Sequence, residues 1–346
     1  METIKFLLFT RLKRSQPTGK AAGFTLIELL VALIMAALII TPLLGFMINI
    51  LSTDRREQAK ATSEQEIQAA ADYITRDLQQ AVYIYDAQAL NNDLDLKDGT
   101  TSGIKDQLPS VDDGTPVLAF WKRELIKNVV PYQESASCPG ECNDAFAYSL
   151  VAYYLIQGDD PSNPNWSNAA RIGRFEISDG VGNPYEDPTN PNDDYISGHE
   201  PDPGFALFNT DLPGTLNTRM NRWEKGKQPY TKSVDILVDY VDDTEAQTVG
   251  LLPPSSDDVP REICPASPEW TQVPDYSQVA DEFKTYSFYA CVNWEANTAK
   301  VYLRGNALAR IHSAPNQIEY KESRSSFFPT ATVEVKGVGG LSQGGS

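Results

Sequence analysis

One carboxylate interrupts the longest apolar stretch of this sequence. Residues 24–51 carry a single charged side chain, Glu28, near the start of the run. A carboxylate at that depth in hydrocarbon costs several kcal/mol unless it finds a partner, and charged residues in membrane segments are functional by default. We therefore expect Glu28 to pair with a positive group that the apolar run itself does not supply.

The residues before Glu28 suggest the origin of that positive group. Residues 20–28, KAAGFTLIE, resemble the class III signal of type IV prepilins, in which a basic leader ends in glycine and phenylalanine opens the apolar helix. The resemblance implies that a prepilin peptidase removes a leader, residues 1–23, by cutting between Gly23 and Phe24, and that the new N-terminus on Phe24 is methylated. Glycine suits the scissile position because its backbone can approach a peptidase closely. The ammonium of Phe24 could then pair with Glu28 of a neighbouring subunit and fix their axial register. An ordinary anchor whose Glu28 only snorkels to the surface is the alternative.

The apolar run is long enough to cross a membrane. As a helix, residues 24–51 would span about 42 Å, against about 30 Å of hydrocarbon. A secretory signal has a shorter apolar region followed by small residues at a cleavage site. Basic residues precede the run, so we expect a single-pass inner-membrane protein with a cytoplasmic N-terminus and a periplasmic head. Pro42 removes a backbone donor and should kink or loosen the helix as a helix breaker, unless the membrane segment simply tolerates it.

The helix is predicted to continue beyond the membrane as an amphipathic segment, residues 52–85. Apolar residues recur at three- and four-residue spacing from Ile67 to Val82, and charged residues such as Asp77 lie largely off that stripe. A continuous helix ending near Val82 would be about 88 Å long. Its second half would present the apolar stripe to a globular head, residues 86–337.

The head is predicted to be rich in β structure. Seven segments combine β-branched or aromatic residues with flanking turn formers, and residues 295–299 suit a hairpin between two of them. An antiparallel sheet packed on the amphipathic half-helix makes an α+β fold, the ladle of type IV pilins. The glycine-rich tail, residues 338–346, should be disordered. The predicted strands are Val117–Trp121, Tyr148–Ile156, Arg171–Ile177, Val234–Val241, Tyr286–Trp294, Lys300–Arg304 and Thr332–Lys336.

Whether the four cysteines are oxidised depends on the compartment in which the head lies. Outside the cytoplasm, Cys138, Cys142, Cys264 and Cys291 are expected to form two structural disulfides. Three connectivities are possible. A local bridge across the tight turn CPGEC is sterically possible and would leave the other two cysteines to pair. Metal binding is the alternative for the first pair, but the two histidines of the chain offer no ligand spacing.

Charge and motifs limit the function further. The first 23 residues carry a net charge of +4, so the rest of the chain carries −22 of the total of −18. Such an acidic surface repels phosphate backbones, which argues against nucleic acid as the main partner. The sequence has no Gly-x-Ser-x-Gly elbow, phosphate-binding glycine loop or zinc motif, so we expect neither enzyme activity nor a cofactor. Acidic loops at 93–98, 159–168 and 186–194 have oxygen ligands suited to Ca²⁺ but no EF-hand register, and solvated loops are the preferred interpretation.

Less regular strings resemble one subfamily. Residues 41–46, 53–60, 81–86 and 301–308 are similar to the cyanobacterial hormogonium polysaccharide secretion pseudopilin C family. The resemblance implies a minor subunit that primes or caps a fibre coupled to exopolysaccharide secretion and gliding motility. Its partners would be the prepilin peptidase, other pilins or pseudopilins, the inner-membrane assembly platform and membrane lipid, with exported polysaccharide as a further candidate. A type II secretion pseudopilin resembling subunit J and a pilus-borne polysaccharide-binding adhesin are the alternatives.

Overall fold

The computed structural model describes most of the chain as two compact units. The first unit ends at Asp54 and the second begins at Arg55. The described residues are 23–97, 101–133, 138, 142–158, 165–186, 194–246, 264–339 and 341. The leader before Gly23, most of the predicted tail and much of two acidic loops lie outside them, so the expectations for those segments stay predictions.

A single helix, α2 (Leu26–Gln79), accounts for the apolar run and the segment that follows it. Its apolar part is exposed, and by length and composition it could cross a membrane. The helix continues without interruption through Pro42, and the hydroxyl of Thr41 donates a 2.8 Å hydrogen bond to the carbonyl of Ala37. The loosening expected at Pro42 stays a prediction.

The helix ends earlier than predicted. Gln79 is its last residue, and Ala81–Ile84 form the edge strand β1. The sequence pattern predicts a helix to about Val82 and an amphipathic segment to residue 85. All four side chains of β1 are buried, and its backbone pairs antiparallel with β2 (Gly114–Pro131). A helix on the surface of a core buries one side of a segment, whereas this strand buries both. That environment suits its β-branched and aromatic residues.

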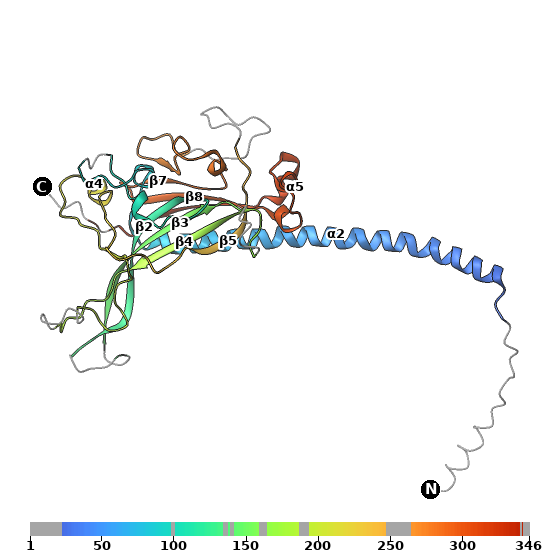
Figure 1. Cartoon of the computed structure of the whole chain (residues 1–346), viewed down its shortest axis with the longest axis horizontal. Coiled ribbons are helices and arrows are strands. Elements are labelled where there is room, and N and C mark those ends of the chain that lie inside the picture. The colour runs from blue at the N-terminus through green and yellow to red at the C-terminus, as the bar shows by residue number, and fades with distance from the viewer. Residues whose placement is uncertain are drawn as a thin grey trace, which may run out of the picture. The chain divides into compact units, whose positions relative to one another are not determined.

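The second unit contains two antiparallel sheets, in the strand orders β1-β2-β3-β4-β5 and β6-β7-β8-β9. Figure 1 labels β2 to β5 of the first sheet and β7 and β8 of the second. All seven predicted strands are present, and the predicted hairpin joins β7 to β8. Sequence reasoning missed β1 and the three-residue β6. A long apolar helix followed by an antiparallel head is the predicted α+β, pilin-like architecture. The remaining strands are β3 (Cys142–Ile156), β4 (Ala170–Ser178), β5 (Asp235–Val241), β6 (Thr271–Val273), β7 (Phe288–Asn293), β8 (Thr298–Arg304) and β9 (Thr330–Lys336). The short helices are α3 (Ala87–Asn91), η1 (Lys105–Gln107), α4 (Leu216–Met220), η2 (Asp281–Phe283), η3 (Ala307–Arg310), α5 (Pro315–Ile318) and η4 (Glu322–Phe327).

Strands β2 and β3 extend beyond the rest of their sheet as a two-stranded hairpin. The later part of β3 pairs with both β2 and β4, whereas its earlier part pairs with β2 alone. A disulfide between Cys138 and Cys142, with Cα atoms 6.1 Å apart, lies at the end of this hairpin. The second disulfide joins Cys264 to Cys291 of β7, with Cα atoms 5.5 Å apart. The two expected disulfides are therefore both formed, and the described residues include no free cysteine.

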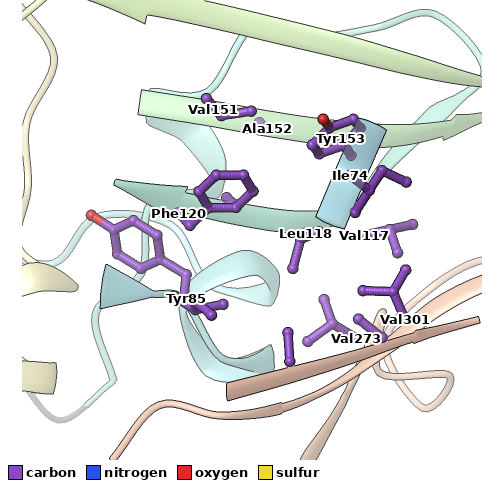
Figure 2. Close-up of a cluster of buried hydrophobic side chains, with 14 of the residues drawn as sticks. Ile74, Tyr85, Val117, Leu118, Phe120, Val151, Ala152, Tyr153, Val273 and Val301 are labelled. Atoms are coloured by element: carbon purple, nitrogen blue, oxygen red, sulfur yellow. The ribbon is translucent and has the colours of Figure 1, made fainter. Parts of the chain in front are cut away.

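The two sheets and the second half of α2 share one hydrophobic core. Figure 2 shows Ile74 of α2 beside Val117 of β2 and Tyr153 of β3, with Val301 of β8 on the other side of the core. The stripe predicted on the helix is thus its buried face. Its other buried apolar members are Ile67, Ala70, Ala71 and Leu78.

Candidate cleavage and assembly site

Thr25 immediately precedes α2 and caps its N-terminus. The carbonyl of Thr25 accepts hydrogen bonds from the backbone N–H groups of Glu28 at 3.0 Å and Leu29 at 3.1 Å. Its hydroxyl accepts from the N–H of Glu28 at 3.3 Å and makes a longer 3.5 Å contact with Oε2 of the same residue. Threonine at the N-cap with glutamate three residues later has the spacing of a capping box. Here the carboxylate contacts the hydroxyl of Thr25. The Thr-x-x-Glu spacing could have revealed it in the sequence, where only the charge of Glu28 was considered.

The predicted scissile bond lies outside the helix. Gly23 and Phe24 precede the first helical residue, and Phe24 is 81% exposed. A Cβ built on Gly23 would meet no other atom within 4 Å. A peptidase could therefore bind this backbone in an extended conformation without first breaking the hydrogen bonds of α2.

The site places a negative charge at the end of the helix where the dipole is positive. The free N–H groups of a first helical turn carry about half a positive charge, which stabilises a nearby carboxylate such as Glu28. Cleavage after Gly23 would add the ammonium of Phe24 at the same end, where the dipole disfavours it. Glu28 is the one residue of the run 24–51 that can offset this cost. The arrangement can thus hold the ammonium group of a neighbouring chain.

The residues of this site lie within a known sequence motif. The model of the prokaryotic N-terminal methylation motif matches residues 19–44, which include Gly23, Phe24, Glu28 and Pro42. Together with the long apolar helix and the antiparallel head, the match supports a type IV pilin-like protein anchored in a membrane by a single helix. The motif implies processing by a prepilin peptidase and assembly with other pilins. No curated protein and no solved structure matches the chain.

The head contains a buried ionic network that sequence reasoning missed. Asp77 of α2 is 6% exposed, although the helical pattern placed it off the apolar stripe. Its carboxylate accepts hydrogen bonds from the hydroxyl of Tyr153 at 2.7 Å and from Nε of Arg174 at 2.8 Å, and Nζ of Lys122 lies 3.5 Å away. Glu176 binds Lys122 at 2.7 Å and Arg174 at 2.6 Å. The network therefore fastens α2 to strands β2, β3 and β4.

The charges of this network stabilise one another. Burial alone would raise the pKa of Glu176, but the hydrogen bond and charge of Lys122, followed by Arg174, hold that pKa below its usual value. Burial would likewise lower the pKa of Lys122, but the hydrogen bond and charge of Glu176, followed by the charges of Asp77 and Glu124, more than offset this and raise that pKa. Two carboxylates face two cations in a closed arrangement, which indicates a structural role rather than proton transfer.

The described residues offer no metal site. They contain no group of three or more histidine, cysteine, aspartate or glutamate side chains that could hold a metal ion. Much of two of the three loops weighed as Ca²⁺ sites falls outside these residues, so that alternative stays untested. One carboxyl group has an unusual environment: burial, followed by the charge of Asp242, raises the pKa of Asp243 to about 7. Asp242 itself is buried and paired with Arg304 at 2.8 Å.

Proposed function

We propose that this chain is a minor pilin or pseudopilin whose helix enters a fibre by its processed N-terminus. The observation that carries the proposal is the start of α2, where the hydroxyl of Thr25 caps the helix and contacts the carboxylate of Glu28, close after the exposed bond that follows Gly23. The prepilin peptidase cleaves that bond, and the new N-terminus on Phe24 is methylated. The inner-membrane assembly platform then moves the subunit from the lipid into the fibre.

The role of Glu28 follows from the low dielectric of a helix bundle. An ammonium or carboxylate left unpaired away from water costs several kcal/mol, and an opposite charge with good geometry offsets much of that cost. The ammonium of Phe24 on one subunit and the carboxylate of Glu28 on the next are such a pair. Because both lie at the same end of their helices, pairing requires a defined axial step between subunits.

We further propose that the fibre supports polysaccharide export and gliding. The support is the resemblance of four strings to a polysaccharide secretion pseudopilin family, and two of these strings have a clear structural part. Residues 81–86 begin with β1 and end at Asp86, whose carboxylate accepts a hydrogen bond from the N–H of Ala89 at 3.0 Å and caps α3. Residues 301–308 include Gly305, where a Cβ would lie 2.7 Å from Cγ1 of Ile67 on α2. These strings build the junction of helix and sheets, so their similarity supports a head of the same construction.

Glu28→Leu in a deletion strain tests the proposal. An anchor needs only apolarity, so the variant should insert, be cleaved after Gly23 and remain in the membrane. We expect it to be absent from sheared fibres and to leave polysaccharide export unrestored. Glu28→Gln keeps the shape of the side chain but removes its charge. It should fail in the same way, because it too lacks the negative charge that pairs with the ammonium.

The readouts also separate the alternatives. Secreted polysaccharide, secreted protein, motility and pilus number should be scored together in the deletion strain. Loss of secreted protein with normal polysaccharide would favour type II secretion. Normal export with lost glycan binding by intact fibres would favour an adhesin. If Glu28→Leu enters fibres and restores export fully, the pairing role of Glu28 is wrong.

A further inference from the structure

A pocket of about 300 Å³ lies beside the first residues of the second unit. Two guanidinium groups and an imidazole line it, from Arg56 of α2, Arg324 of η4 and His312. Of the described residues that line it, none is a carboxylate, although the chain has 47 acidic residues against 29 basic ones. The remaining lining residues are Leu308, Ile311, Gln317 and Phe327. The pocket thus concentrates positive charge next to an apolar wall in an otherwise acidic protein.

The walls of the pocket are held in place by contacts within the second unit. The ammonium of Lys60 on α2 lies 4.4 Å from the centre of the Phe327 ring. Leu308 is 5% exposed and packs in a small core among the short helices η3, α5 and η4. Arg324 lines the pocket, and one terminal nitrogen of its guanidinium donates a 2.9 Å hydrogen bond to the carbonyl of Gln317, another lining residue. The pocket is therefore formed before any ligand arrives.

Chain length alone keeps this pocket near the membrane surface. Arg56 follows Leu51, the last residue of the apolar run, by only five residues of α2. Five residues rise about 7.5 Å in a helix and cannot exceed about 18 Å even when fully extended. The headgroup region on each side of a bilayer is about 5–8 Å thick. Arg56 therefore lies at the level of the lipid headgroups or just above them.

We propose that this pocket binds the phosphate group of an anionic phospholipid in the leaflet from which α2 emerges. Guanidinium groups match phosphate oxygens in charge and in planar geometry. Basic residues next to a membrane helix are attracted to anionic lipids. The apolar wall formed by Leu308, Ile311 and Phe327 suits the glycerol and the first methylene groups of the same lipid. A bound lipid holds this part of the second unit at the membrane until the subunit is extracted.

Lipid titration of the full-length protein in a neutral detergent tests the site. Short-chain phosphatidylglycerol is added, and retained lipid is counted by native mass spectrometry. We expect one phosphatidylglycerol to be retained per chain in preference to zwitterionic phosphatidylcholine. Arg56→Gln and Arg324→Gln should each weaken its binding about fivefold, which corresponds to about 1 kcal/mol per basic residue.

Arg55→Gln is the matched control. Arg55 carries the same charge on the same helix, is exposed and lies one residue closer to the membrane, but it does not line the pocket. Its substitution should leave lipid affinity unchanged. If Arg55→Gln weakens binding as much as Arg56→Gln, or if phosphatidylcholine is retained equally well, the proposal is wrong.

A titration with inorganic phosphate distinguishes a lipid phosphate from free phosphate as the ligand. If free phosphate binds in a manner that depends on Arg56 and Arg324 while phosphatidylglycerol does not, the pocket is a phosphate site and the lipid assignment fails. Arg324 also supports Gln317, so its variant is compared with wild type by thermal unfolding. Should that variant unfold early, the comparison of Arg56→Gln with Arg55→Gln decides the outcome alone.

Discussion

The attachment of α2 to the first sheet can be tested by removing the carboxylate of Asp77. In an Asp77→Ala variant, Arg174 loses the acceptor of two contacts, from Nε and from a terminal nitrogen, each at 2.8 Å. The hydroxyl of Tyr153 loses its 2.7 Å acceptor as well. The side chains of Asp77 and Arg174 are 9% and 14% exposed, so water cannot fully replace these contacts.

The expected loss of unfolding free energy depends on the contacts that remain in the Asp77→Ala variant. Breaking a buried ion pair by removing one partner costs about 3–5 kcal/mol. Glu176 still binds Lys122 at 2.7 Å and Arg174 at 2.6 Å, which limits the loss, so we expect a value near the lower end, about 3 kcal/mol. Glu124→Gln is the control, because Glu124 contacts the same Lys122 at 3.6 Å but is 55% exposed. Its substitution should cost less than about 1 kcal/mol.

Urea unfolding of the full-length protein in a neutral detergent, followed by tryptophan fluorescence at neutral pH, measures both variants. The free energy of unfolding should fall far more for Asp77→Ala than for Glu124→Gln. Equal effects would refute the inference that burial gives the network its strength. Replacing Asp77 and Arg174 together by apolar residues should cost less than Asp77→Ala alone, because no uncompensated charge is then left buried.

Three further predictions concern processing, redox state and pH. Mass spectrometry of the mature protein should find a methylated N-terminal Phe24, whereas an intact leader in fibre-associated protein would contradict the motif. Native protein should resist thiol labelling, and labelled native cysteines would contradict this prediction. Replacing Cys264 and Cys291, which are 27 residues apart, by serine should lower the free energy of unfolding by up to about 3–4 kcal/mol. Burial raises the pKa of Asp243 from 3.8 to about 7, so its contribution to stability is present in acid and is lost as the pH rises toward 7. Asp243→Asn should therefore stabilise the protein by up to about 4 kcal/mol at about pH 8 and have little effect at about pH 4, and an equal effect at both pH values would exclude this titration.

The N-terminal site was predictable because its chemistry is local in sequence. A charge such as Glu28 in an apolar run needs an explanation, and the explanation lies within a few residues, at Gly23 and Phe24. The strands were predictable where composition and turn formers agreed. β1 was missed because the spacing of Ala81 and Val82 continues the helical stripe, and only the pairing with β2 shows that the strand buries both faces.

The buried network and the basic pocket could not be predicted in the same way. The helical pattern describes Asp77 by its own neighbours, whereas its partners Lys122, Tyr153 and Arg174 come from three strands of the head. The pocket likewise unites Arg56 with side chains far along the chain. Periodicity identifies the face of a helix that is apolar, but it contains no information about a polar group buried by distant partners.

The exposed apolar helix determines where the selectivity of assembly must come from. The apolar part of α2 is exposed among the described residues, so lipid covers it before assembly and neighbouring helices cover it in the proposed fibre. Lipid tails are as apolar as leucine, and moving these side chains from lipid into a helix bundle gains little hydrophobic free energy. The carboxylate of Glu28 differs, because it is costly in either environment unless an ammonium is beside it. Within the proposed fibre that ammonium comes from Phe24 of another subunit. The charge pair therefore makes assembly more favourable, whereas the apolar surface contributes little. For this reason a single substitution at Glu28 is expected to stop assembly and leave anchoring intact.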